Sequence, residues 1–315
     1  MRVLRDDVEV VDWYWYIGFG QMKISAIVTI PPYASFIDEV AEHPIVGGLR
    51  LNTVMPLRET HHDVLGRLSK FKKPLWVDLK GRQLRVAEPA MPPFTEIKLS
   101  HSIKVHTPVD AYFSDGNERV RVAAVDGKRL IMEDGPRRMV GPGESVNIIH
   151  PTLEIEGTLT DTDCAYLAAM KELGLTKVML SYVESARDVD EVKSLLPNAE
   201  VVSKIETQKG LDFARKEKAK RGQLMAARGD LYVEVLEPHK IIPALKTIIQ
   251  SDPNAIVASR ILDSLAWTPV PVSADISDVA FLMEIGYRTF MLGDQVCMKR
   301  DSVLEALNLL QEMSG

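Results

Sequence analysis

The chain has 315 residues, of which 46% are hydrophobic and 26% are charged, and its formal net charge is -6. This composition is ordinary for a globular protein and excludes a mainly disordered chain. The net negative charge excludes a global basic field, so we expect neither nucleic acid nor a membrane as a partner. The length allows one large α/β domain, alone or with a small second domain.

The cysteines and the N-terminus indicate a cytoplasmic protein. Cys164 and Cys297 are far apart in the sequence, so neither a zinc motif nor a redox motif is predicted. Residues 1–22 form a predicted N-terminal extension, which is too acidic for a signal peptide and too short in its apolar part to span a bilayer. Its run Trp13–Tyr16 predicts a packing or subunit-contact surface, consistent with a homo-oligomer, with a ligand-stacking platform as the alternative.

Apolar runs alternate with amphipathic runs along most of the chain. Near-continuous Val, Ile, Leu and Ala is typical of buried parallel strands. Eight such strands are predicted, at 24–30, 48–52, 74–80, 177–181, 199–206, 223–230, 254–259 and 288–292. Helices are predicted between them, among others at 160–174, 185–196, 239–250 and 273–286. The alternation predicts an α/β fold of the (β/α)8 TIM barrel type, with an open doubly wound sheet as the alternative.

One region breaks this rhythm. Residues 86–153 contain no convincing helix but several short alternating strands, with Asp-Gly turns typical of hairpins. The turns are Asp115-Gly116, Asp126-Gly127 and Asp134-Gly135. We therefore predict a small all-β, barrel-like domain inserted after barrel strand 3, which leaves 23–85 and 154–315 for the barrel.

Charged and small polar residues follow the predicted strands. In a (β/α)8 barrel, the active site lies at the C-terminal ends of the strands, so these residues are expected to meet on one rim. They are Arg50, Asn52, Asp78, Lys80, Ser181, Lys204, Glu206, Arg228, Gly229, Asp230, Ser259, Arg260, Gly293 and Asp294.

The segment "VVSKIETQKG" places Lys204 and Glu206 two residues apart at the end of a strand, and therefore on one face. Asp230 ends the next strand, and two carboxylates close together favour Mg2+ or Mn2+ between them. A lysine beside them could stabilise a developing oxyanion. The alternative is purely structural: a Lys204–Glu206 or Lys204–Asp78 ion pair, with the rim carboxylates held by neighbouring lysine and arginine side chains.

Nine segments resemble the pyruvate kinase family, in the family's order and spacing. They are "GGLRLNTV", "VDLKGRQLR", "AYFSDG", "GPGESVNI", "TDTD", "SKIETQKG", "AARGDLYVEV", "ASRILDSL" and "PVPVSADISDVA". The resemblance covers most of the chain after about residue 23. It implies the catalytic barrel and the inserted β domain, without the family's C-terminal regulatory domain.

The resemblance also implies roles for single residues. Lys204 corresponds to the lysine that stabilises the enolate and the transferring phosphoryl group. Glu206 and Asp230 correspond to the ligands of Mg2+ or Mn2+. Gly229 and Asp230 would offer backbone N–H groups to the substrate carboxylate, and Ser259 stands near the methyl carbon of pyruvate.

Further matches lie on the phosphate side. Arg50, which with Lys204 and Ser259 completes the expected catalytic set, matches an arginine near the phosphates, as does Arg85. Asn52 lies with them in the expected nucleotide and phosphate region. Asn52 and Asp78 match half of a monovalent-cation site.

Several positions depart from the family pattern. Val54 and Leu79 replace two oxygen-bearing residues of the cation site, which makes dependence on K+ doubtful. Met55 stands near a usual histidine on the nucleotide side, Gln83 replaces a glutamate, and Arg260 replaces a glutamine. The metal and lysine core is thus retained, whereas its nucleotide surroundings are changed.

Three functions are compatible with this pattern. The main hypothesis is metal-dependent phosphoryl transfer between phosphoenolpyruvate and ADP through a pyruvate enolate, with pyruvate and ATP as the products. The second is an aldolase or decarboxylase that acts on pyruvate or another 2-oxo acid through the same enolate. The third is a degenerate, non-catalytic ligand-binding homologue.

Overall fold

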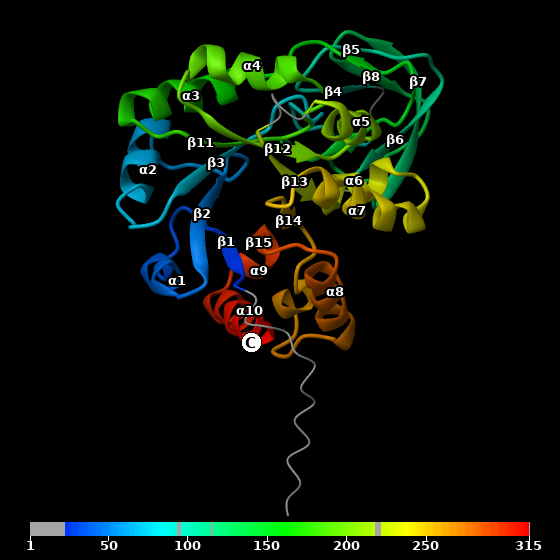
Figure 1. Cartoon of the computed structure of the whole chain (residues 1–315). Coiled ribbons are helices and arrows are strands. Elements are labelled where there is room, and N and C mark those ends of the chain that lie inside the picture. The colour runs from blue at the N-terminus through cyan, green and yellow to red at the C-terminus, as the bar shows by residue number, and fades with distance from the viewer. Residues whose placement is uncertain (1–22, 93–95, 115, 218–221, 315) are drawn as a thin grey trace, which may run out of the picture.

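The computed structural model describes residues 23–92, 96–114, 116–217 and 222–314. In these residues, eight parallel strands close into a barrel in the order β1-β15-β14-β13-β12-β11-β3-β2 (Figure 1). The predicted (β/α)8 barrel is therefore confirmed, and the open sheet is excluded. The expected N-terminal extension and Asp115 lie outside the described residues.

The barrel strands agree closely with the predicted ones. They are β1 (Ser25–Thr29), β2 (Val46–Asn52), β3 (Leu75–Leu79), β11 (Lys177–Leu180), β12 (Glu200–Ile205), β13 (Gln223–Ala227), β14 (Ile256–Ala258) and β15 (Thr289–Leu292). The largest difference at a single strand end is in β13, for which the sequence predicts an end at residue 230. It ends at Ala227 because the chain turns there directly into a helix.

Helices follow the strands and cover the outside of the barrel (Figure 1). They are α1 (Ile37–Glu42), α2 (His61–Leu68), α3 (Asp161–Leu173), α4 (Ala186–Leu195), α5 (Gln208–Lys216), α6 (Arg228–Glu234), α7 (Ile241–Ser251), α8 (Ser273–Glu284), α9 (Asp294–Cys297) and α10 (Arg300–Met313). Two 3-10 turns, Pro238–Lys240 and Asp263–Ala266, complete the connections.

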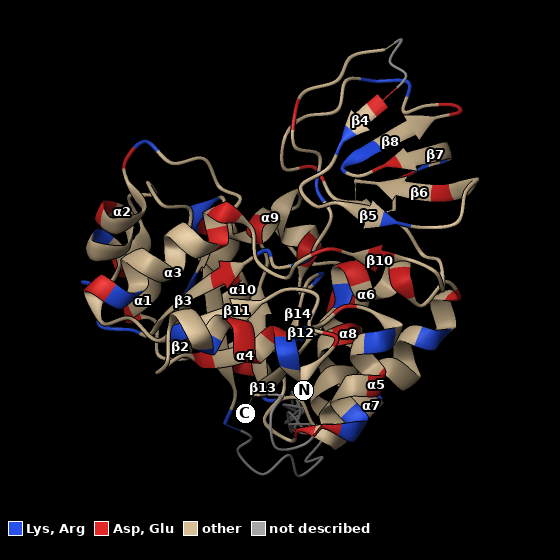
Figure 2. Cartoon of the chain, turned by 90° about the horizontal axis from the view of Figure 1, so that it is seen from above, with Lys and Arg blue, Asp and Glu red and all other residues tan. Residues whose placement is uncertain are grey.

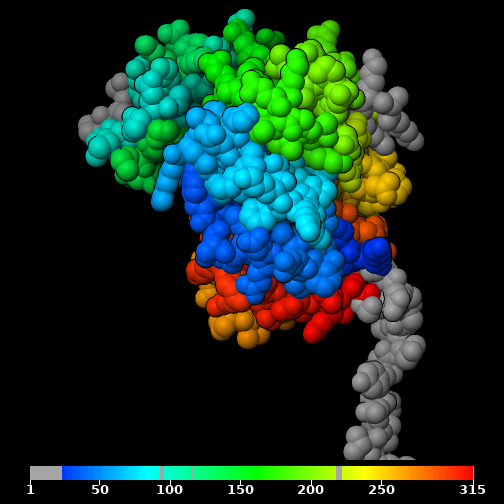
Figure 3. Space-filling view, turned by 90° about the vertical axis from the view of Figure 1, so that its left-hand side faces the viewer, coloured from blue at the N-terminus to red at the C-terminus, as the bar shows by residue number. Residues whose placement is uncertain are grey.

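The barrel closes between its first and last strands. β1 pairs in parallel with both β2 and β15. The Thr29 hydroxyl donates a hydrogen bond to the Leu292 carbonyl at 2.8 Å across this seam. In the space-filling view, the blue N-terminal part of the barrel accordingly lies directly beside the red C-terminal helix (Figure 3).

Side chains alternate between two cores along the barrel strands. Val201 and Ile205 of β12 belong to the large core between the strands and the helices, whereas Val202 belongs to the small core inside the barrel. Successive side chains of a strand point to opposite faces. Lys204 therefore shares the interior face with Val202, and Glu206 follows on the same side at the C-terminal rim.

A second, antiparallel structure lies between β3 and β11 and packs on its own hydrophobic core. Its five-stranded sheet has the order β4-β8-β7-β6-β9, and β5 and β10 form a two-stranded sheet. The strands are β4 (Glu96–Lys98), β5 (Ile103–Lys104), β6 (Val109–Phe113), β7 (Glu118–Asp126), β8 (Arg129–Met132), β9 (Val146–Asn147) and β10 (Glu154–Ile155). This sheet is consistent with the predicted inserted β domain.

The surface carries both signs of charge. Acidic and basic residues are interspersed along the ribbon of the barrel and of the inserted sheet alike (Figure 2). Among the described residues, no helix combines the length and the apolar character that a membrane span requires.

Candidate active site

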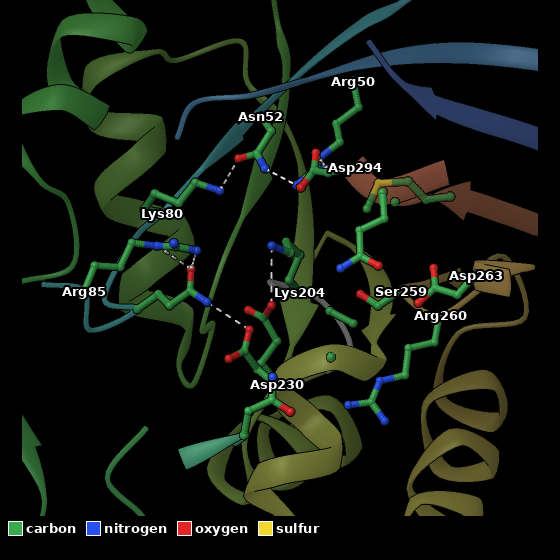
Figure 4. Close-up of a pocket in the computed structure, with 18 residues that line it drawn as sticks. Arg50, Asn52, Lys80, Arg85, Lys204, Asp230, Ser259, Arg260, Asp263 and Asp294 are labelled. Atoms are coloured by element: carbon green, nitrogen blue, oxygen red, sulfur yellow. Dashed lines mark hydrogen bonds and ion pairs between the residues drawn. The ribbon is translucent and has the colours of Figure 1, made fainter. Parts of the chain in front are cut away.

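A cavity of about 320 Å³ lies at the C-terminal ends of the barrel strands (Figure 4). Most of the predicted site residues line it. Its lining includes Arg50, Asn52, Lys80, Gln83, Arg85, Lys204, Glu206, Gly229, Asp230, Ser259, Arg260, Asp263 and Asp294. The β2, β3, β12, β13, β14 and β15 ends thus contribute to one site, as the barrel geometry predicts.

Lys204 lies at the centre of a charged network. Its ammonium donates to Ser181 Oγ at 2.7 Å and lies 3.2 Å from Asp78 Oδ1 and 3.4 Å from Glu206 Oε1. Burial alone would lower the pKa of Lys204, but the carboxylates of Asp78 and Glu206 outweigh it and raise the pKa. Both ion pairs considered from the sequence therefore exist, and they hold the charged ammonium at the cavity.

Asp78 is fully buried beneath the cavity and neutralises several cations. Arg50 donates to Asp78 through Nη2 and, at 2.9 Å, through Nε. Burial favours protonation of Asp78, but Lys204, Lys80 and Arg50 outweigh it, so that its pKa falls far below the usual range. Arg50 also contacts Asp294 at 3.2 Å, so its guanidinium is held by carboxylates on two sides.

Glu206 and Asp230 form the acidic side of the cavity. Burial raises the pKa of Glu206 to about 7, with Lys204 opposing the rise and Asp230 adding to it. The remaining Glu206 oxygen accepts the backbone N–H of Tyr182 at 2.7 Å. A buried carboxylate that is repelled by a second one is stabilised when a cation lies beside both.

These two carboxylates fit a hard divalent cation as a partial ligand set. Mg2+ and Mn2+ prefer oxygen ligands, and Mg2+ usually takes only one or two carboxylates together with water and substrate oxygens. Among the described residues, no group of three or more His, Cys, Asp or Glu side chains could hold a metal ion. Glu206 and Asp230 would therefore need further oxygens from a ligand and from water.

Three partners of Asp230 were not identified from the sequence. Tyr182 Oη donates to Asp230 Oδ1 at 3.0 Å, Asn147 Nδ2 donates to the same oxygen at 3.2 Å, and Gln83 Nε2 donates to Oδ2 at 2.9 Å. Asn147 also donates to Tyr182 Oη at 2.6 Å. Asn147 belongs to β9 of the inserted sheet, and no local sequence pattern points from it to Asp230.

The oxygens expected for a monovalent cation have other partners. Lys80 Nζ donates to Asn52 Oδ1 at 2.7 Å and lies 3.9 Å from Asp78 Oδ2, and the Asn52 amide donates to Asp294 at 2.7 Å. Burial lowers the pKa of Lys80 to about 7. The side chains as arranged here do not fit K+, because the Lys80 ammonium places a positive charge at Asn52 Oδ1, and this oxygen also accepts the Val54 N–H at 3.3 Å.

Gly229 and Ser259 are neighbours in the wall of the cavity. Gly229 and Asp230 lie in the first turn of α6, where backbone N–H groups lack partners within the helix. A Cβ atom at Gly229 would lie 3.5 Å from Ser259 Oγ, in ordinary van der Waals contact. Ser259 itself has a φ of 68°, in the left-handed region that non-glycine residues rarely adopt.

Arg85 reaches the cavity from the segment after β3. Its guanidinium donates to Gln83 Oε1 at 2.6 Å and to the Gly143 carbonyl of the inserted region. A second cavity, of about 690 Å³, continues from there between the barrel and the inserted sheet. Lys80, Gln83 and Arg85 line both cavities.

The fold and the site together define a TIM-barrel protein with an inserted β sheet and a lysine–carboxylate centre at the C-terminal rim. Residues 78–297 match the family model for the pyruvate kinase barrel domain. This match extends over more than half of the sequence, and the chain belongs to the pyruvate kinase family.

Curated relatives agree with this assignment. The chain is 26% identical to a pyruvate kinase of Methanocaldococcus jannaschii over 93% of its own length and 69% of that protein. It is 27% identical to a pyruvate kinase of Thermoplasma acidophilum over 93% of its length and 58% of that protein. A pyruvate kinase of Agrobacterium vitis is 34% identical over 58% of this chain and 39% of the relative. The chain therefore spans only part of the length of these relatives.

Proposed function

We propose that this protein transfers a phosphoryl group between phosphoenolpyruvate and ADP through a pyruvate enolate. One observation carries the proposal: the Lys204 ammonium and the carboxylates of Glu206 and Asp230 border one cavity at the catalytic end of the barrel. A cation and an acidic metal-binding pair are the groups that enolate and phosphoryl chemistry need side by side.

Each residue has a distinct role in this proposal. Glu206 and Asp230 would hold Mg2+ or Mn2+, which when bound supplies positive charge for phosphoryl transfer. Lys204 stabilises the negative charge that develops on the enolate oxygen. Gly229 and Asp230 bind the substrate carboxylate through their free backbone N–H groups, and Ser259 lies beside the methyl carbon.

The second cavity supports a place for the nucleotide. It adjoins the first one at Lys80, Gln83 and Arg85, and its volume of about 690 Å³ is in the range of small-molecule sites. ADP bound between the barrel and the inserted sheet would bring its terminal phosphate to Arg85. Arg50 and Asn52 complete the expected phosphate side.

A coupled assay with phosphoenolpyruvate, ADP and Mg2+ or Mn2+ tests this function. We expect ATP formation by the wild type and a loss of about 100- to 1000-fold in kcat for Lys204→Ala, because one positioned cation is removed from the developing charge. Lys193→Ala, on the exposed face of α4, is the matched control. Absence of ATP formation with both metals, in K+ and in Na+ salts, would rule out phosphoryl transfer.

A specific observation favours a second candidate. Arg50 is held by Asp78 and Asp294, and Arg85 is held by Gln83 and by the inserted region. Both arginines expected for phosphates are thus held by partners within the chain, although they line the same cavity as the lysine–carboxylate centre. Aldol or decarboxylation chemistry on a 2-oxo acid needs only that centre. Metal-dependent deuterium exchange into the methyl group of pyruvate without nucleotide would support this candidate.

A further inference from the structure

Arg260 brings a solvent-exposed positive charge to the candidate active site. It follows Ser259 directly after β14, and its side chain lines the cavity that also contains Lys204 and Asp230. Figure 4 shows Arg260 on the opposite side of Lys204 from Arg85. Among the residues that the structure describes, no ion pair or hydrogen bond involves its guanidinium, which lies 4.6 Å from the centre of the Tyr232 ring.

The other cations of the cavity have partners within the chain. Arg50 and Lys204 are paired with carboxylates, Lys80 with the amide oxygen of Asn52, and Arg85 with that of Gln83. Asp263 lines the same cavity, and burial, with Asp275 adding to it, raises its pKa against the opposing effects of Arg260 and Arg228. No ion-pair contact is formed between Arg260 and Asp263 in the described structure, so the guanidinium remains available to a ligand.

The backbone holds Arg260 in this place at a conformational cost. Ser259 and Arg260 have φ values of 68° and 56°, which L-residues other than glycine rarely adopt. Arg228 fixes this turn, because it donates to the Ser259 carbonyl at 2.8 Å and 3.0 Å and to the Arg260 carbonyl at 2.9 Å. Asp278 holds Arg228 in turn, at 2.7 Å. The hydrogen bonds from Arg228 thus hold the strained turn in place, while the side chains of Ser259 and Arg260 line the cavity.

We propose that Arg260 binds a second carboxylate, and that the site therefore takes, besides pyruvate and phosphoenolpyruvate, a dicarboxylic 2-oxo acid or its enol phosphate. The inference rests on the proposed function, in which the first carboxylate binds at Gly229 and Asp230. Ser259 and Arg260 are adjacent and both line the cavity, so a substituent that extended beyond Ser259 would reach Arg260. A guanidinium recognises a carboxylate through two parallel hydrogen bonds. The Tyr232 ring restricts the conformations of the Arg260 side chain, so that less conformational entropy is lost when a carboxylate binds.

Matched ligand pairs test this assignment by calorimetry in the presence of Mg2+. 2-Oxoglutarate ends in a second carboxylate where 2-oxovalerate has a methyl group. Malate and 2-hydroxybutyrate differ in the same way and have one carbon fewer. In at least one pair, we expect the wild type to bind the dicarboxylate roughly tenfold or more tightly than the monocarboxylate of that pair. Arg260→Gln should remove this preference without weakening the monocarboxylate, and Arg260→Lys should retain part of it.

Arg187→Gln, on the exposed face of α4, is the control and should leave the preference unchanged. An unchanged thermal midpoint of Arg260→Gln shows that the strained turn survives the substitution. Equal binding within both pairs, or a preference that persists in Arg260→Gln, overturns the inference. If phosphoryl transfer is intact in the same preparation, only the inference fails; if no acid binds and no ATP forms, the proposed function fails with it.

Discussion

The role of a single residue in the site depends on its surroundings as well as on its residue type. Lys80 and Lys204 are both lysines that follow or end a barrel strand, yet their surroundings differ. Lys204 contacts two carboxylates, which raise its pKa, whereas burial lowers the pKa of Lys80 to about 7. Lys204 is therefore suited to stabilise charge on a substrate, and Lys80 is suited to hold the Asn52 amide.

The contact between Lys80 and Asn52 predicts an activity that does not need K+. At pH 6.5, below the pKa of Lys80, its ammonium supplies the positive charge beside Asn52 and Asp78 that a monovalent cation would otherwise supply. We expect turnover in tetramethylammonium salts to be within about twofold of turnover in K+ salts. This ratio corresponds to a difference of less than about 0.5 kcal/mol in the activation free energy. A tenfold or larger activation by K+ would contradict this prediction.

At the scale of elements, α3 fixes the turn that carries Lys80. Thr160 caps the helix by accepting the Asp163 N–H, and the Asp163 carboxylate accepts the Thr160 N–H in return. The same carboxylate accepts the backbone N–H groups of Lys80 at 2.9 Å and of Gly81 at 3.1 Å. Gly81 has a φ of 51°, and a Cβ atom there would lie 2.5 Å from the Ser181 carbonyl. Only glycine fits this turn.

Loss of the cap should be measurable. Thr160→Ala removes the hydroxyl that accepts the Asp163 N–H, and we expect a loss of about 1 kcal/mol in the free energy of unfolding, typical of such caps. Thr160→Ser keeps the oxygen and should lose only a few tenths of that amount. Urea unfolding of the three proteins measures the difference. A serine variant as unstable as the alanine variant would show that the methyl contact, rather than the cap, matters.

A buried histidine ties the stability of the inserted region to pH. His101 is 5% exposed, its Nδ1 lies 2.9 Å from Ser100 Oγ, and its Nε2 has no partner among the described residues. Burial, with Lys128 and Arg82 adding to it, lowers the pKa of His101 to about 4 from 6.5. Between these values the unfolded chain binds more protons than the folded one, so stability falls as pH decreases from 6.5 toward 4.

We expect His101 to cost about 2 kcal/mol of stability on going from pH 7 to pH 5. His101→Asn cannot take up this proton, so its unfolding free energy should change less over the same interval. Urea unfolding of both proteins at the two pH values gives the difference directly. Parallel pH profiles of wild type and variant would assign the acid sensitivity to other groups.

At the scale of the whole molecule, the inserted sheet completes the acidic side of the site. Asn147 of β9 contacts Asp230, Tyr182 and Glu234, which lie on the barrel. Burial, with Asp230 adding to it and Asn147 opposing, raises the pKa of Glu234 to about 8. The orientation of Asp230 thus depends on how the inserted sheet sits against the barrel.

Because Asp230 is a proposed ligand of the divalent cation, Asn147→Ala should weaken binding of that cation. Partners of metal ligands typically contribute 10- to 100-fold in metal affinity, and we expect a rise of about tenfold or more in the Mg2+ concentration for half-maximal activity. Asn198→Ala, at an exposed position, is the control and should leave the Mg2+ dependence unchanged. An unchanged Mg2+ requirement in Asn147→Ala would remove the inserted sheet from the metal site.

The sequence by itself determined the barrel and the interior positions of Lys204 and Glu206. The strand period of two is local, so a buried apolar run dictates which side chains share a face. The tertiary structure decided the partners. Asn147 and Asp230 are 83 positions apart, and Arg50 and Asp294 are 244 apart. Whether Asn52 binds a metal cation or the Lys80 ammonium depends on competition among side chains that only the folded barrel brings together.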